Sequence, residues 1–575
     1  MSHLGIRAFI SCWLVTVFAL TAFAEVSTDS RLLRNDIHPE SNNIPSSTTT
    51  GIVSAVNQCS GVYPLPFATH WTPHAMWNYA STHPRWQLKM VEKGHHWLPT
   101  FWWGDLQQPW DKQAEAYYRP AIDEVRKRKL PISLVSTQWE RVLYERSPWK
   151  DAKIDDSALE FSSSGKPVAA VSPFGAIKPW SEVGRAWATT PILLKLQELY
   201  PDPPYVVLLS NNEAKKLKQN EVQKSVRYLK RFGAGQSDEF RRRILGDGYI
   251  ERYRALVEGV RLSLTTWKDR AIIIGWGGTN VNFGRGSWWL QGDLPNFGLT
   301  VPGRLNITPF VWDGVAIKYY VDPTYTRNAS DSTLFNPKVE IMSLPLEMNY
   351  ACQQRENYYW EMTTWFEPIV EERIRKEGKV LPHKRYSGFV KFGMWIARPT
   401  AVRHFSSRDE TLSDFGLSLE GIMEAVDEIN QDSVLASFWK SSDLIMNPNV
   451  QHPYRTNVPP EYASALRWAA LSTSLDPPRP WNLKTELPVW VLGLVQRKLE
   501  GSPRWLLLAQ SPQELISSVQ VEVPELGSVQ IRATPSGCYY LIESRDQKPR
   551  SLDVNEGLCS MGIFSGDRKT GVPAE

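Results

Sequence analysis

The chain has 575 residues, of which 42% are hydrophobic and 22% charged, and it contains 25 Trp, 21 Tyr and 20 Phe. This composition excludes a disordered, collagen-like or coiled-coil chain, because such chains lack the apolar surface that offsets the entropy of ordering. The 65 basic and 61 acidic residues leave a formal charge of only +4. We therefore expect no nucleic-acid partner, since binding many phosphates requires a strongly basic surface.

The N-terminus has the pattern of a cleavable signal peptide that ends at residue 24. An apolar run from Ala8 to Leu20 follows Arg7, and Ala22–Ala24 provides the small residues of a cleavage site. The run is shorter than the roughly 20 apolar residues that a membrane-spanning helix needs. We expect a secreted or periplasmic protein without an integral membrane span, whose mature chain begins near Glu25.

Four cysteines follow the signal peptide, and an even number in an oxidising compartment predicts disulfides. Cys538 and Cys559 share one short terminal region, so the simplest pairing joins these two and joins Cys59 to Cys352. The alternative is that some are free buried thiols. The sequence has neither a CxxC nor an HExxH motif, so it predicts no metal site. No cofactor is expected either.

The chain divides into a polar arm over residues 25–57, a long middle region over 58–481 and a terminal region over 482–575. In the middle region, short apolar runs alternate with amphipathic stretches, which predicts repeated β/α units and a mostly parallel sheet. Eight such units favour an α/β fold of the (β/α)8 barrel type. The expected strands are Gly61–His70, His95–Gly104, Leu130–Glu140, Tyr205–Glu213, Ala271–Gly278, one between Phe310 and Glu347, Asn357–Phe366 and Gly388–Ala397.

The terminal region contains short strand-like runs separated by Gly, Pro and Ser turns. In Val519–Val523, apolar and polar residues alternate, as expected when one face of a sheet is buried. We predict a small antiparallel β-sandwich after the barrel, and the sequence does not decide whether it binds glycan or covers the barrel. The strands expected here are Leu487–Gln496, Pro503–Gln510, Val519–Val523, Val529–Ala533 and Cys538–Ile542.

The segment Tyr205–Ala214 carries the strongest indication of chemistry. Five apolar residues lead into Ser-Asn-Asn-Glu, so Glu213 stands at the carboxyl end of a strand, where parallel barrels place their reacting side chains. The alternative is that Glu213 merely begins the next helix, since a first-turn carboxylate is favoured by the helix dipole.

An apolar strand that ends in Asn-Glu, fourth in a (β/α)8 barrel, resembles the acid/base motif of the clan A retaining glycoside hydrolases. The resemblance covers roughly Cys59 to Trp481. It implies that Glu213 protonates the leaving oxygen and that Asn212 hydrogen-bonds a sugar hydroxyl. It also implies a second carboxylate at the end of strand seven, which acts as the nucleophile about 5 to 5.5 Å from the first.

Glu361, in the run NYYWEMTTWF, is the predicted nucleophile. A carboxylate in an aromatic strand is costly unless it faces a polar cavity. Glu347 and Glu367 are alternatives, and Glu367 could instead begin a helix. The prediction requires this run to be the seventh strand rather than the sixth.

Tryptophans end several expected strands and could stack on the apolar faces of sugar rings. We expect Trp102, Trp103 and Trp276 among these platforms, with Asp105 and Glu140 as hydroxyl partners. Trp139 ends a further strand. The alternative for each Trp is an ordinary core position.

Two charged or polar features remain. His70 follows the first expected strand and is spaced i,i+4 from His74, which favours a sugar-contacting or structural histidine over a metal pair. Between Lys215 and Arg270 there are 15 basic and 7 acidic residues. This excess could steer an anionic polysaccharide towards the protein, or it could be a solvated pair of helices.

The sequence as a whole favours a secreted glycoside hydrolase that cleaves a polysaccharide, or an oligosaccharide derived from it, by a retaining double displacement. The basic excess suggests an algal galactan such as agar, porphyran or carrageenan. Two alternatives are a non-catalytic glycan-binding protein and a polysaccharide lyase. The sequence does not predict the oligomeric state.

Overall fold

The structure is a computed structural model. It describes residues 61, 63–71, 84–136, 139–144, 156–210, 217, 219–278, 308–321, 352, 357–366, 382–405, 412–444, 467–470, 489–497, 502–510, 516–523, 526–544 and 549–552. Among these residues, no helix combines the length and the apolar character that crossing a membrane requires.

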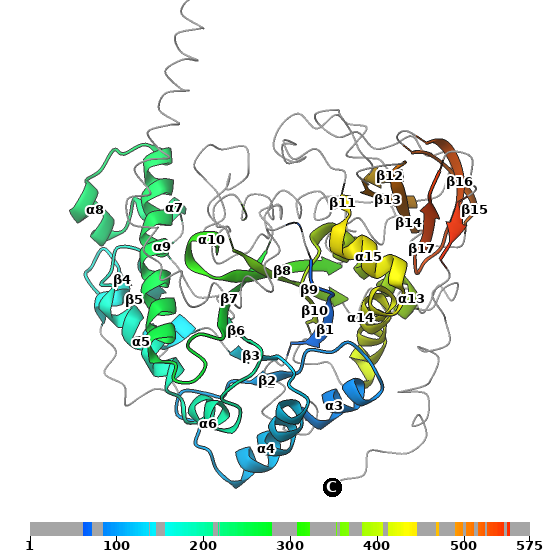
Figure 1. Cartoon of the computed structure of the whole chain (residues 1–575). Helices are drawn as coiled ribbons and strands as arrows, with labels where there is room; N and C mark the ends of the chain where they lie inside the picture. Colours follow the sequence, from blue (N-terminus) through cyan, green and yellow to red (C-terminus); the bar gives the residue numbers. More distant parts are fainter. Residues whose placement is uncertain are drawn as a thin grey trace, which may run out of the picture.

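An eight-stranded, all-parallel sheet forms the centre of the molecule (Figure 1). Its hydrogen-bonded order is β1-β10-β9-β8-β7-β6-β3-β2. Because neighbours in the sheet follow one another along the chain, β6 is the fourth strand and β9 the seventh. The strands are β1 (Phe67–His70), β2 (Thr100–Trp102), β3 (Ile132–Ser136), β6 (Val206–Ser210), β7 (Ala271–Gly278), β8 (Gly314–Val321), β9 (Tyr359–Phe366) and β10 (Ala401–His404).

The sheet closes into a barrel just before β2. Ala68 of β1 forms a parallel bridge with Trp97, and the amide of Ala68 donates to the carbonyl of His96 at 2.8 Å. The register can be followed from Trp103 through all the strand pairs of the sheet, and it arrives at Pro66 before β1. The closing bridge between Ala68 and Trp97 instead pairs Trp103 with position 74. The difference of eight residues is the shear of the barrel. Eight strands with a shear of eight define a (β/α)8 barrel, which confirms the predicted barrel.

Helices follow most of the strands and cover the outside of the barrel. Local signals set their starts: Asp111 caps α4 by accepting a hydrogen bond from the amide of Ala114 at 2.8 Å, and Thr190 caps α6, which begins with Pro191. The helices are α3 (Pro84–Glu92), α4 (Lys112–Lys127), α5 (Lys178–Ala188), α6 (Pro191–Leu199), α7 (Gln219–Val222), α8 (Val226–Phe232), α9 (Asp238–Ser263), α10 (Thr308–Val311), α13 (Pro382–Ala397), α14 (Leu412–Gln431) and α15 (Ser433–Ser441), with the 3-10 turns η4 (Trp139–Leu143) and η5 (Asp156–Ala158).

The predicted strand Gly388–Ala397 is wrong, because this segment is the second half of α13. Its residues from Ser387 to Ala397 are all buried, since α13 lies between the barrel and the C-terminal sheet. A helix buried on all sides shows no amphipathic period, so its apolar run reads like a strand. The eighth strand is instead the short β10, which follows α13.

Antiparallel strands dominate the C-terminal region, as predicted, but the sandwich is uneven. A six-stranded sheet with the main order β11-β13-β14-β17-β18 is accompanied by the two-stranded sheet β15-β16, and β12 pairs with β13 in parallel. Two short strands from before residue 482, β11 and β12, join the larger sheet. The strands are β11 (Asp443–Leu444), β12 (Arg467–Ala470), β13 (Val489–Gln496), β14 (Arg504–Gln510), β15 (Ile516–Val523), β16 (Gly527–Ala533), β17 (Cys538–Ile542) and β18 (Arg550–Ser551).

Both faces of the larger C-terminal sheet are buried. Along β14, Leu506 and Leu508 pack in one cluster with Trp395 of α13 and Leu435 of α15. The intervening Leu507 packs in a second cluster that includes residues of β15 and β16. In Figure 1 the sheet lies beside α13 and α15. The indole N–H of Trp395 also donates to the Tyr539 hydroxyl at 3.0 Å.

The cysteines depart from the predicted pairing. Cys538 is a free thiol, and its sulfur lies 3.1 Å from the Thr534 hydroxyl, so the pairing of Cys538 with Cys559 is wrong. Cys352 is disulfide-bonded. Cys59 and Cys559 lie outside the described residues, and the pairing of Cys59 with Cys352 stays a prediction.

Helices α5 and α9 pack so closely that glycine is required at their contact. A Cβ atom on Gly259 of α9 would lie 2.3 Å from the carbonyl oxygen of Ser181, and one on Gly184 of α5 would lie 2.1 Å from that of Leu256. Backbone atoms cannot move aside as a flexible side chain would, so a methyl group forces the helices apart. Gly246, also within α9, has no atom within 4 Å of its added Cβ.

We predict that Gly259→Ala lowers the free energy of unfolding by about 1–3 kcal/mol through this overpacking. The matched Gly246→Ala change in the same helix should raise it by about 0.5–1 kcal/mol, because alanine restricts the unfolded chain more than glycine does. Urea unfolding followed by circular dichroism measures both. Equal effects of the two substitutions would show that helix contact does not distinguish the sites.

Candidate active site

The two strands that the predicted mechanism needs occupy the predicted places. β6 is the fourth barrel strand and ends at Ser210, and β9 is the seventh. The strand that contains Glu361 is therefore the seventh, as the prediction of the nucleophile requires. Asn212 and Glu213, which follow Ser210, lie outside the described residues, as do the alternatives Glu347 and Glu367.

Glu361 lies in the first half of β9. It is the third of eight residues in that strand and pairs in register with Ala401, the first residue of β10. Its side chain is fully buried. In (β/α)8 barrels the reacting groups lie at the opposite, C-terminal ends of the strands, so this position is deeper than an active-site mouth.

Inside the barrel, Glu361 forms an ion pair with Arg403 of β10. One carboxylate oxygen accepts from Nε of Arg403 at 2.7 Å and also lies 2.7 Å from Nη2, and the other accepts from the Tyr359 hydroxyl at 2.8 Å. Neither side chain of the pair is exposed. Such a pair is stable only when its remaining donors and acceptors are also satisfied.

Arg403 meets that condition by reaching across the lumen to three further strands. Its Nη1 donates to the His70 carbonyl at 2.9 Å and to the Thr100 hydroxyl at 3.2 Å, and its Nη2 donates to the Ser133 hydroxyl at 2.9 Å. One guanidinium thus links β1, β2, β3 and β9. Arg403 was not among the predicted site residues, although a single arginine in the apolar run AVRHF indicates a buried charge.

Two tyrosines surround this ion pair. Burial, and then the nearby charge of Glu361, raise the pKa of Tyr205 and of Tyr359 above the ordinary value. Both hydroxyls therefore stay protonated at neutral pH, and the Tyr359 hydroxyl remains a donor to Glu361. Glu361, Arg403 and Tyr359 thus make a hydrogen-bonded polar cluster in the lumen.

His70 and His404 lie side by side at the ends of β1 and β10. Their rings are 5.7 Å apart between centroids, and both side chains are buried. Burial, followed by the charges of His404 and Arg403, lowers the pKa of His70, and burial lowers the pKa of His404 to about 3. Both rings are therefore neutral at working pH. His74 is not among the described residues, within which no group of three His, Cys, Asp or Glu could hold a metal ion.

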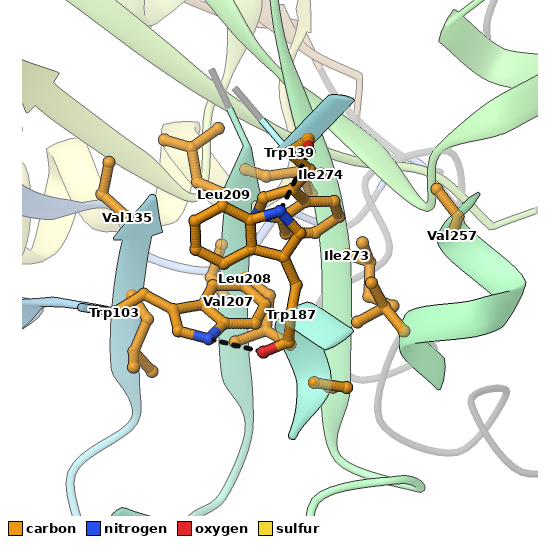
Figure 2. Packing of buried hydrophobic residues seen from close by; sticks show 14 of the residues in the cluster. Trp103, Val135, Trp139, Trp187, Val207, Leu208, Leu209, Val257, Ile273 and Ile274 are labelled. Carbon is orange, nitrogen blue, oxygen red and sulfur yellow. Dashed lines mark hydrogen bonds between the residues drawn. The ribbon is translucent and has the colours of Figure 1, made fainter. Parts of the chain in front are cut away.

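Trp103 belongs to the core and cannot serve as the predicted sugar platform. It is completely buried, and its indole N–H donates to the carbonyl of Trp187 at 3.2 Å. Trp187 in turn donates to the carbonyl of Trp139 at 3.0 Å. Figure 2 shows these three rings packed edge to face among aliphatic side chains of the neighbouring strands.

The other predicted sugar contacts differ in their access to solvent. Trp102 is 8% exposed and Trp276 is 4% exposed, and both have the inward register of the barrel strands. Glu140 is fully buried and accepts a hydrogen bond from the Tyr253 hydroxyl at 2.6 Å, so it has a structural role. Asp105 is half-buried, and burial raises the pKa of its carboxyl group against the opposing charge of Arg141.

Comparisons with known proteins give low similarity. No protein-family model and no curated protein matches the sequence. Among solved structures, a β-mannanase from a symbiotic protist of the termite Reticulitermes speratus is 11% identical, with a TM-score of 0.30 over 67% of this chain and 92% of its own. A GH36 α-galactosidase of Geobacillus stearothermophilus is 9% identical, with a TM-score of 0.34 over 86% of this chain and 56% of its own.

A third structure, a conserved exported protein of Bacteroides fragilis, is 9% identical, with a TM-score of 0.37 over 84% of this chain and 99% of its own. All three TM-scores lie below 0.5. The assignment of this chain as a (β/α)8 barrel consequently rests on its own strand order, register and closure.

We predict that Glu361→Gln lowers the free energy of unfolding by about 3–5 kcal/mol, because it leaves the buried Arg403 charge without a counter-ion. Arg403→Met should cost a similar amount. The double variant Glu361→Gln/Arg403→Met should cost less than the sum of the two single changes by at least about 1 kcal/mol. Urea unfolding of the four proteins measures this coupling, and additive losses would contradict it.

Proposed function

We propose that the protein is a glycoside hydrolase that cleaves a polysaccharide with retention of configuration at the C-terminal mouth of its barrel. The supporting observation is the count of strands: β6, followed by Asn212 and Glu213, is the fourth strand, and β9 is the seventh. These are the two strands that supply the acid/base and the nucleophile in the clan that the sequence resembles.

Glu213 is the proposed acid/base, with Asn212 as the partner of a sugar hydroxyl. Glu213 follows the last residue of β6 by three positions. In the first step it protonates the leaving oxygen, and in the second it takes a proton from the attacking water. The same carboxyl group thus serves both steps.

The height of each carboxylate along the barrel favours Glu367 over Glu361 as the nucleophile. Ser210 lies in register with Trp360 through Gly275 and Val315. From β6 to β9 the register descends by one residue per strand, because the shear is eight over eight strands. The residue of β9 at the height of Ser210 is therefore Thr363, three residues beyond Trp360.

If each strand direction is continued past its last residue, the sequence spacing would put Glu213 three residues above the common height of Ser210 and Thr363, and Glu367 four residues above it. Glu361 lies two residues below that height. The resulting five-residue offset between Glu213 and Glu361 corresponds to about 16 Å along a strand, well beyond the roughly 5.5 Å that retention requires. We therefore assign the attack on the anomeric carbon to Glu367, and the ion pair in the lumen to Glu361.

In this mechanism, Glu367 forms a covalent glycosyl-enzyme as Glu213 protonates the departing sugar. Water, deprotonated by Glu213, then displaces the carboxylate, and two inversions give net retention. Trp102, Trp276 and the half-buried Asp105 are the proposed substrate contacts from the earlier set. Secretion through the N-terminal signal peptide would bring the enzyme to an external polysaccharide.

We predict that Glu213→Gln and Glu367→Gln each lower kcat by at least about 10²–10⁴-fold, the usual contribution of a positioned acid or base. Wild type and variants are tested against agarose, κ-carrageenan, konjac glucomannan and alginate, with reducing ends and product anomers as readouts. In the matching alanine variants, azide should give glycosyl azides of opposite anomeric configuration. In Glu367→Ala it attacks the substrate directly, with one inversion, and in Glu213→Ala it attacks the glycosyl-enzyme in place of water, which completes two inversions.

The matched control is Glu361→Gln, assayed where circular dichroism shows a folded protein. It should keep kcat within about tenfold of wild type, because it does not touch the reacting atoms. A collapse of kcat in this variant with full activity in Glu367→Gln would return the nucleophile to Glu361. Unsaturated uronate products would indicate a lyase, and binding without cleavage of any glycan a carbohydrate-binding protein.

A further inference from the structure

A cationic lobe is formed by elements that follow β3 and β6 in the chain. It consists of the hairpin β4 (Leu159–Phe161) and β5 (Pro167–Val171), the helix α8 and the first half of α9. Residues 226–243 contain six basic and two acidic residues. Figure 1 shows α8 beside the start of α9, away from the C-terminal sheet.

Buried hydrogen bonds hold the lobe in one shape. The carboxylate of Glu160 in β4 accepts from the Ser172 hydroxyl at 2.6 Å and from the Ser225 hydroxyl at 2.7 Å. Ser225 also caps α8 by accepting from the amide of Tyr228 at 3.2 Å. Arg227 donates to the carbonyl of Leu159 at 2.9 Å. A ligand at this surface would therefore meet a preorganised frame.

Three cations of the lobe take no part in the hydrogen bonds just described. Lys230 and Arg231 are exposed and Arg243 is half-buried, and none of them has a carboxylate partner among the side chains that the structure describes. Arg241, by contrast, pairs with Asp238. The charges of Lys230, Arg231 and Arg243 can attract an external anion.

Two of these cations lie against aromatic rings that contact each other. The guanidinium of Arg231 lies 5.2 Å from the centre of the Phe232 ring, and that of Arg243 lies 5.4 Å from the centre of the Phe240 ring. The centres of the Phe232 and Phe240 rings are 5.7 Å apart. A guanidinium stacked on a ring keeps its edge N–H groups free to bind an oxyanion.

Apolar side chains lie next to the cations. Val226 is 37% exposed and Leu229 is 38% exposed, and both belong to α8 together with Lys230 and Arg231. Charge beside exposed apolar surface matches a glycan whose sugar rings have apolar faces and whose substituents are anionic. A sulfate ester, with three peripheral oxygens, can accept from two cations at once.

We propose that Lys230, Arg231 and Arg243 bind the sulfate esters of a polysaccharide at a site separate from the cleavage site. In sequence, both parts of the lobe follow the C-terminal ends of barrel strands, as Glu213 does, so we expect a bound chain to extend towards the mouth. This last step rests on the proposed hydrolase function, whereas the binding itself does not.

The test measures retardation of the full chain in native gels that contain κ-carrageenan, alginate or agarose, in the Glu213→Gln background so that cleavage cannot interfere. κ-Carrageenan should retard the protein, with weaker retardation as NaCl is raised, because exposed charges are screened beyond about 8 Å at 0.15 M salt. Adding Lys230→Glu/Arg231→Glu should weaken the affinity about tenfold or more.

The control is Lys89→Glu/Lys93→Glu, which reverses two exposed charges at the end of α3 and should leave the affinity unchanged. Equal retardation of the two double variants overturns the proposal, as does retardation by alginate alone or by no anionic gel. Loss of hydrolysis in Glu213→Gln with unchanged retardation separates this site from the proposed active site. If κ-carrageenan retards the protein but the protein hydrolyses no glycan, the proposed hydrolase function is wrong and the proposed binding site is supported.

Discussion

The closure between β1 and the segment before β2 is the constraint on which the rest of the structure depends. A single parallel bridge between Ala68 and Trp97 fixes the shear of the barrel at eight residues. That shear sets which side chains point inward and how high each stands along the axis. It brings Arg403 opposite Thr100 and Ser133, and it sets Glu361 below the height of Ser210 at the end of β6.

Inside the barrel, a buried ion pair between Glu361 and Arg403 adds to the aliphatic packing of the lumen. Arg403 bonds to groups from four strands besides its own ladder contacts. Replacing such a buried pair by well-packed apolar groups is often tolerated, whereas removing one member is not. The pair thus fixes the relative positions of β1, β2, β3 and β9 beneath the proposed site.

Much of the barrel could be predicted from the sequence, because its strands are short apolar runs that end at turns. Ala271–Gly278 was predicted with its observed bounds, and strands four and seven were numbered correctly. Burial accounts for two kinds of failure. A helix buried on every side, such as α13, loses the amphipathic period and resembles a strand in the sequence. Trp103 and Glu140, at the ends of expected strands, are buried in the structure, and the sequence pattern alone does not show this.

The site was less predictable than the fold for a related reason. A sequence pattern shows that Glu361 lies in a strand, but not its height in the barrel, which depends on the register of all eight strands together. The ion pair with Arg403 joins residues 42 positions apart in sequence. No local pattern identifies such a partner, whereas Glu213 was singled out by its place after a strand.

The shared core between α13 and the C-terminal sheet also bears on how the chain can be divided. Leu506, Leu508 and Tyr539 lie in the same cluster as Trp395 and Phe438. Cutting the chain near residue 482 would leave large apolar side chains of two helices in water, at roughly 25 cal/mol for each Å² uncovered. We therefore do not expect the barrel to fold when it is expressed without the C-terminal strands, because these strands cover part of its surface.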